Sequence, residues 1–128
     1  MAAEFSKNGG NKHDALAQHE QKATAILREG NDLRALNKTI SLCNGNLSPA
    51  MRGEILRFCR GCLEKGNFIL GKRAHTYATR QPVPEQHMRD VCEAFRRDLH
   101  NRLGMDPVLA DLCIERRTDA SLDLPPLP

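Results

Sequence analysis

The segment from Pro84 to Gly104, PEQHMRDVCEAFRRDLHNRLG, limits the possible folds of this chain more than any other stretch. It begins with proline and ends with glycine, residues that are favoured at the first position of a helix and just after its last. Its apolar residues recur at helical spacing, whereas its basic residues fall on another side. We therefore predict an amphipathic helix with a basic face and one buried stripe, made of Met88, Val91, Cys92, Phe95, Leu99 and Leu103.

Composition favours helices in the rest of the chain as well. The sequence has no tryptophan, one tyrosine and three valines among 128 residues, whereas strands are enriched in aromatic and β-branched residues. A chain of this length usually forms one domain and buries a core without disulfides or metals. The expected fold class is all-α, a small bundle of four to five short helices over residues 12–117. We expect residues 1–11 to be a disordered N-terminus and residues 118–128 an extended, proline-rich tail.

Capping residues mark several expected helix boundaries. Ser48-Pro49 and Asp106-Pro107 each place a side-chain cap directly before proline, which is a strong signal for the start of a helix. Asn31 is predicted to cap the N-terminus of an earlier helix. These signals set the expected order of elements along the chain.

The segment 68–80 is ambiguous. Its first residues, FIL before a glycine, fit a short strand, whereas Leu70, Ala74, Tyr77 and Ala78 share one face of a helix. We favour the helix, because no second strand is available to pair with the first.

Neither a membrane span nor a secretory signal is expected. No run approaches the roughly 20 apolar residues that a spanning helix needs, and the first residues, MAAEFSKNGGNKHD, lack the apolar core of a signal peptide. The five cysteines are an odd number and are predicted to be reduced, small buried apolar residues. We therefore expect an intracellular protein, cytoplasmic in the first place and nuclear as the alternative.

One cysteine pattern has the spacing of metal ligands. Cys59-x-x-Cys62 is followed by His75 after twelve residues, close to the interval of a ββα zinc finger. No histidine stands three to five residues further on, and the next, His87, is twelve residues away. The two cysteines also share a face of a predicted helix, as two core residues do. We expect no cofactor, with zinc at these four residues as the less favoured reading.

Signatures of catalysis are missing from the sequence. Gly61, Gly66 and Gly71 are too widely spaced for a phosphate-binding loop, and no Gly-Lys-Ser/Thr follows them. There is no G-x-S-x-G and no H-E-x-x-H. Asp90 and Glu93 stand three or four residues from arginines, so ion pairs account for them without catalysis. We expect a regulatory protein and not an enzyme.

Positive charge is concentrated in the middle of the chain. Residues 52–102 carry eleven basic and six acidic side chains, a net charge of +5, whereas residues 103–128 have a net charge of −3. Most of these basic residues are arginines, which bind phosphate through two parallel hydrogen bonds. A single tyrosine offers little for stacking unpaired bases, so duplex RNA is the favoured ligand. The expected phosphate-binding residues are Arg52, Arg57, Arg60, Lys72, Arg73, Arg89, Arg96 and Arg97.

Protein interaction is the alternative function. Leu33, Leu36, Ile40 and Cys43 recur at steps of three, four and three, which forms a narrow apolar seam. A single short seam of this kind more often packs within its own chain, but it can also receive a partner helix or a second copy of the chain. We expect a homodimer, because the helices are short and the core is modest. The alternative is thus a helical adaptor, chaperone or antagonist that acts as a dimer on a protein partner.

Overall fold

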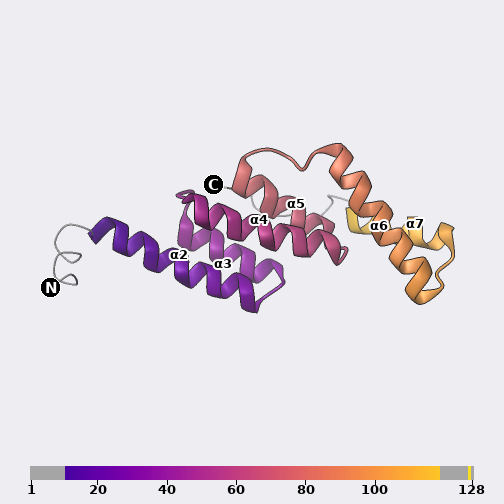
Figure 1. Cartoon of the computed structure of the whole chain (residues 1–128), viewed down its shortest axis with the longest axis horizontal. Coiled ribbons are helices and arrows are strands. Elements are labelled where there is room, and N and C mark those ends of the chain that lie inside the picture. The colour runs from indigo at the N-terminus through magenta and orange to yellow at the C-terminus, as the bar shows by residue number, and fades with distance from the viewer. Residues whose placement is uncertain (1–10, 119–126, 128) are drawn as a thin grey trace. The chain divides into compact units, whose positions relative to one another are not determined.

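The computed structural model describes the backbone of residues 11–118 and 127, and the side chains of residues 18–118 and 127 (Figure 1). Six helices and no strands occur in this part of the chain, so the all-α class is confirmed and the expected count of four to five helices is too low. The predicted tails lie almost wholly outside the described residues. No described helix is both long and apolar enough to cross a lipid bilayer. The helices are α2 (Asn11–Glu29), α3 (Leu33–Cys43), α4 (Pro49–Glu64), α5 (Phe68–Thr79), α6 (Glu85–Leu103) and α7 (Pro107–Thr118).

The described chain divides into two compact units, the first ending at Glu54 and the second beginning at Ile55. The boundary falls inside α4, so this helix gives its N-terminal turns to unit 1 and its remaining turns to unit 2. Unit 1 therefore consists of α2, α3 and the start of α4. Unit 2 consists of the rest of α4 with α5, α6 and α7.

A tight connection joins α2 and α3 into a hairpin (Figure 1). Asp32 caps α3, because its Oδ1 accepts a hydrogen bond from the backbone N–H of Ala35 at 2.9 Å. The prediction of Asn31 as the cap is therefore wrong by one residue, since the capping side chain bonds to the N–H three positions later. Gly30 lets the backbone at the end of α2 lie close to the first turn of α3, because a Cβ at Gly30 would lie 2.9 Å from the Cβ of Ala35. The core of the hairpin is formed by Ala23, Leu27, Ala35, Leu36, Thr39, Ile40 and Cys43.

Hydrogen bonds connect the start of α4 to α2. The hydroxyl oxygen of Ser48 accepts from the backbone N–H of Met51 at 3.1 Å, which confirms the predicted cap. The same hydroxyl donates to Glu20 at 2.7 Å, and the backbone N–H of Ser48 donates to the other oxygen of Glu20 at 3.0 Å. Arg28 donates two hydrogen bonds to Glu54 at 3.1 and 3.2 Å. These bonds, and then the charge of Glu54, raise the pKa of the Arg28 guanidinium.

Aromatic side chains form the centre of the core of unit 2. Phe68 and Tyr77 of α5 are fully buried. Residues 68–79 form one helix, which confirms helix over strand for this segment. The ring of Phe68 meets the ring of Phe95 on α6 edge to face, with ring centres 5.6 Å apart. Close packing of α5 on α4 requires Gly71, because a Cβ there would lie 2.7 Å from Cδ2 of Leu63.

The helix α6 buries less than its apolar pattern predicts. Only Phe95 and Leu99 of the six-residue stripe are buried, and Leu103 is 62% exposed. Gly104 adopts the left-handed conformation with φ 64° and ends the helix directly after Leu103. The prediction of one continuous buried stripe is therefore wrong at its C-terminal end.

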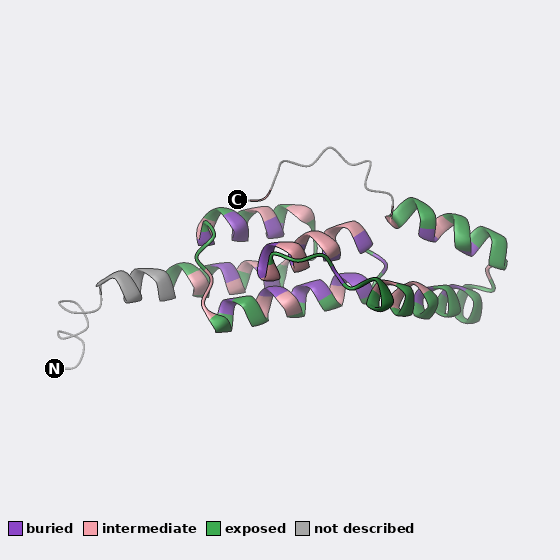
Figure 2. Ribbon diagram, turned by 90° about the horizontal axis from the view of Figure 1, so that it is seen from above, coloured by how far each residue is buried: buried purple, intermediate pink, exposed green. Residues whose placement is uncertain are grey.

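The buried face of α7 is not the face that carries most of its large apolar residues. Ala110 and Ile114 are buried, whereas Val108, Leu109 and Leu112 are 68%, 51% and 51% exposed. A short side chain at the contact, as at Ala110, lets two helix axes approach closely. Figure 2 accordingly shows α6 and α7 mostly in the colour of exposed residues.

Candidate functional site

The basic residues predicted on α4 and α5 are distributed over both units. Arg52 belongs to unit 1, whereas Arg57 and Arg60 lie on the turns of α4 that belong to unit 2, and all three are exposed. Lys72 and Arg73 of α5 are half-buried, and burial lowers the pKa of Arg73. No acidic residue occurs within α5, so its charge is wholly positive.

Carboxylates accompany every arginine on α6. The helix carries four arginines and four acidic residues, which balance in number over α6 as a whole. The arginine side chains are 47% to 68% exposed, and exposed pairs of this kind contribute about 0–1 kcal/mol each. The pairs are Arg89–Glu85 at 3.5 Å, Arg96–Asp111 at 2.6 Å, Arg97–Glu93 at 3.4 Å and Arg102–Asp98 at 2.8 Å.

A groove beside α5 and α6, here called the α5–α6 groove, brings three of the eight predicted residues together. Lys72 comes from α5, and Arg89 and Arg96 come from α6. Burial raises the pKa of Cys92 in this groove, while the positive charges of Arg96 and Lys72 act in the opposite direction. Both cations thus act on one point of the groove. The other lining residues are Pro82, Val83, Glu85, Met88, Glu93 and Thr118.

The four residues of the less favoured zinc site are not brought together. Cys59 and Cys62 are buried in the core of unit 2, and burial raises the pKa of each thiol to about 11. The ring Nδ1 of His75 lies 2.9 Å from the backbone carbonyl oxygen of Gln81, and His87 is exposed on α6. The described residues contain no group of three or more metal-ligating side chains close enough to hold an ion.

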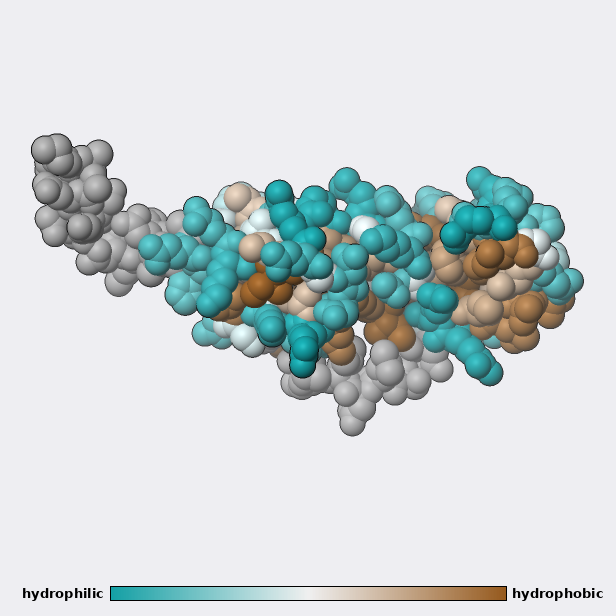
Figure 3. All heavy atoms as spheres, turned by 90° about the horizontal axis from the view of Figure 1, so that it is seen from below, coloured by the Kyte–Doolittle hydropathy of each residue, from teal (hydrophilic) through white to brown (hydrophobic). Residues whose placement is uncertain are grey.

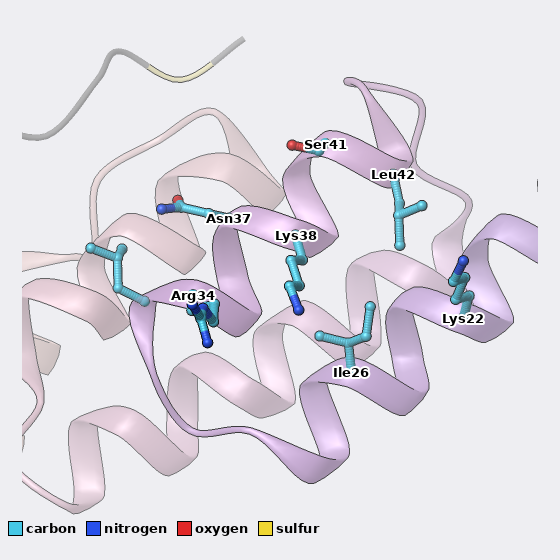
Figure 4. A pocket seen from close by; sticks show the side chains of 8 residues that line it. Lys22, Ile26, Arg34, Asn37, Lys38, Ser41 and Leu42 are labelled. Carbon is cyan, nitrogen blue, oxygen red and sulfur yellow. The ribbon is translucent and has the colours of Figure 1, made fainter.

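A second groove, here called the α2–α3 groove, was not expected from the sequence. Its cations are Lys22 of α2 and Arg34 and Lys38 of α3, and no carboxylate lines it. Figure 4 shows Lys38 pointing from α3 toward Ile26 on α2. The remaining lining residues are Leu33, Asn37, Ser41 and Leu42.

A sequence signal for this groove exists in α3. Arg34 and Lys38 stand four residues apart in a helix that contains no acidic residue. A charge count over residues 1–51 hides this signal, because acidic residues elsewhere in the segment reduce the net charge to +1. Counting charge over each predicted helix, instead of over segments of up to 51 residues, reveals it.

Apolar side chains gather on the surface of the α6–α7 hairpin, at the right of Figure 3. Leu103 from the end of α6 and three residues of α7 are all more than half exposed. We call Leu103, Val108, Leu109 and Leu112 the α6–α7 patch. Large exposed apolar patches on soluble proteins usually mark contact sites.

Comparison with known proteins identifies no relative of this chain. It matches no protein-family model, no curated protein and no solved structure. Any functional inference therefore rests on the geometry of the two grooves and of the α6–α7 patch.

Proposed function

We propose that the protein binds nucleic acid through basic side chains of unit 2, with duplex RNA as the favoured ligand, and acts as a regulator and not as an enzyme. The observation that carries this proposal is the α5–α6 groove, where Lys72, Arg89 and Arg96 line one space. Contacts from such side chains to phosphate supply most of the non-specific affinity for a nucleic-acid backbone. No aromatic residue lines the groove, which favours backbone contacts over base stacking.

The ion pairs on α6 weaken the expected binding without preventing it. Exposed pairs one helical turn apart contribute about 0.3–0.5 kcal/mol. A phosphate can therefore replace the carboxylate of Glu85 at Arg89. Because Glu85 and Glu93 remain close to the groove, we expect a dissociation constant on the order of 1 µM or weaker at physiological salt.

Mobility-shift titrations with duplex RNA and duplex DNA of equal length, at several salt concentrations, test this proposal. Each phosphate contact adds about −0.9 to the slope of log affinity against log salt, so three basic side chains give a slope of about −3. The Lys72→Gln/Arg96→Gln variant is expected to weaken binding about tenfold or more at low salt and to flatten the slope by about 2. Absence of binding at low salt, or binding that salt does not weaken, rules the proposal out.

Arg102→Gln is the matched control for these measurements. Arg102 lies on the same helix as Arg96 and is also exposed and ion-paired, but it does not line the groove. Its loss removes one positive charge from the unit without removing a proposed contact. A loss of affinity as large as that of the Lys72→Gln/Arg96→Gln variant contradicts the groove as the binding site.

We also propose that the protein acts inside the cell, in the cytoplasm with the nucleus as the alternative, and without a cofactor. All five cysteines carry free thiols, as is usual in a reducing compartment. Metal analysis of the purified protein tests the absence of a cofactor. One zinc ion per chain contradicts it.

A dimeric adaptor is the second candidate, and the α6–α7 patch favours it. Burial of four exposed apolar side chains against a second copy or a partner helix removes unfavourable surface from water. Sedimentation equilibrium is expected to show a dimer that Leu109→Lys and Leu112→Lys each dissociate. A stoichiometric protein partner that is lost on these changes and kept on Arg97→Gln supports an adaptor. A monomer without such a partner contradicts this candidate.

A further inference from the structure

We propose that the α2–α3 groove is a docking site for an acidic amphipathic helix of a partner protein. The groove lies within unit 1 and shares no residue with the α5–α6 groove. The proposal is therefore independent of nucleic-acid binding by unit 2, and each can fail without the other.

The α3 side of the groove is long enough to lie along a short helix. Along α3, two rows of side chains repeat at four-residue spacing, which places each row on one line of the helix surface. A row of three such positions spans about 12 Å, or a little over two helical turns. In Figure 4, Leu42 of α3 points toward α2, on the side where Lys22 and Ile26 lie. The rows are Leu33–Asn37–Ser41 and Arg34–Lys38–Leu42.

The charge of the groove selects an acidic ligand. Lys22, Arg34 and Lys38 form no ion pair with any side chain that the structure describes. Two carboxylates close in sequence are engaged elsewhere, Glu20 with Ser48 and Asp32 with the N-terminus of α3. Glu29 of α2 does not line the groove. Three cations thus face the solvent beside one groove. Such a surface attracts a partner that places carboxylates along its rim.

The floor of the groove favours a peptide over a phosphate backbone. Ile26, Leu33 and Leu42 line it and are only half-buried, so each retains apolar surface to cover. A phosphate backbone offers no apolar surface, whereas an amphipathic helix presents leucines on one face and glutamates at its edges. Charge and apolar complementarity together point to the helix.

Titration with a synthetic peptide tests the proposal on the full-length protein. The probe is a helical peptide of about 14 residues with leucines at i, i+3, i+4 and i+7 and glutamates on both flanks. A second peptide with lysine at every glutamate keeps the leucine face and is the control. Amide NMR spectra are expected to show binding of the acidic peptide, with shifts confined to residues 22–42. Absence of binding at ~1 mM peptide, or equal binding of both peptides, overturns the proposal.

Charge reversal in the groove provides the matched variant. Arg34 and Lys38 are exposed, so the Arg34→Glu/Lys38→Glu variant is expected to fold and to lose affinity for the acidic peptide about tenfold or more. The Lys72→Gln/Arg96→Gln variant is expected to bind the peptide like the wild type. An unchanged affinity of the first variant overturns the proposal. Displacement of the peptide by duplex RNA, with RNA shifting the same amides, also overturns it and assigns the groove to phosphate.

Discussion

The backbone of Gly66 lies against the ring of Phe95, so closely that a Cβ on Gly66 would stand 2.6 Å from Cζ of the ring. Arg117 of α7 closes the same place, because it donates to the carbonyl oxygen of Gly66 at 3.3 Å and its guanidinium lies 5.3 Å from the centre of the Phe95 ring. The α4–α5 connection, α6 and α7 therefore meet at one aromatic side chain.

Gly66→Ala is expected to lower the free energy of unfolding by about 2–4 kcal/mol. The φ of +83° costs an L-residue roughly 1 kcal/mol, and the methyl group displaces the Phe95 ring at a cost of about 1–3 kcal/mol. Gly53 of α4 is the matched control, because a Cβ there meets nothing within 4 Å. Gly53→Ala is expected to stabilise by about 1 kcal/mol. Urea unfolding measures the free energy of unfolding of both variants. An equal change in the two variants contradicts the close contact between Gly66 and Phe95.

Ser48→Ala is expected to lower the free energy of unfolding by about 1–2 kcal/mol. The change removes the side-chain cap of α4 and one of the two hydrogen bonds that join Ser48 to Glu20. Ser41→Ala, at an exposed position of α3, is expected to leave stability unchanged or slightly raised, since alanine is the stronger helix former. Thermal unfolding followed by circular dichroism compares the two, and equal melting temperatures contradict the role of Ser48.

Alkaline pH is expected to destabilise the protein through Cys59 and Cys62. Burial raises the pKa of both thiols from 9.0 to about 11, so only the unfolded state ionises between these values. Their contribution to stability is therefore complete below pH 9 and is lost as the pH rises to about 11, at roughly 1.4 kcal/mol per pH unit for each thiol. Urea unfolding across this range measures the slope. An equally steep slope in a Cys59→Ala/Cys62→Ala variant assigns the effect to other groups.

Asp111→Asn is expected to raise the affinity for duplex RNA roughly two- to threefold at low salt. The substitution removes the charge that now pairs with Arg96 at 2.6 Å, which leaves the guanidinium available to phosphate. Both side chains are about half exposed, so stability is expected to change by less than about 1 kcal/mol. Asp98→Asn releases Arg102 outside the groove and is the control for net charge. Mobility-shift titrations measure both affinities. An equal rise in affinity for duplex RNA in both variants indicates an effect of net charge without a defined binding site.

Local signals in the sequence predicted where helices begin and end. Ser48 and Asp106 act as caps in the structure as expected, because capping depends on side-chain and backbone groups within four residues. Gly104 ends α6 for a similarly local reason, its left-handed backbone. The cap of α3 was misplaced by one residue because Asn31 and Asp32 are both good capping residues.

The buried face of a helix and the partner of a charged residue could not always be predicted, because both depend on contacts between residues far apart in the sequence. The pair Arg96–Asp111 joins residues fifteen positions apart and exists only because α6 and α7 form a hairpin. On α7, Ala110 and Ile114 are buried, whereas the apolar residues Val108, Leu109 and Leu112 remain exposed. The pairing of Arg97 with Glu93 on α6, in contrast, follows from their four-residue spacing, as the sequence predicted.

Because α4 runs without interruption through the boundary at Glu54 and Ile55, the two units share a cooperative element. Each carbonyl near the boundary on the unit 1 side accepts a bond from an amide four residues on, in unit 2. Melting of the α4 turns in one unit therefore removes hydrogen bonds from the adjoining turns of the same helix in the other. A fragment cut at this boundary would leave each half with a helix too short to persist on its own.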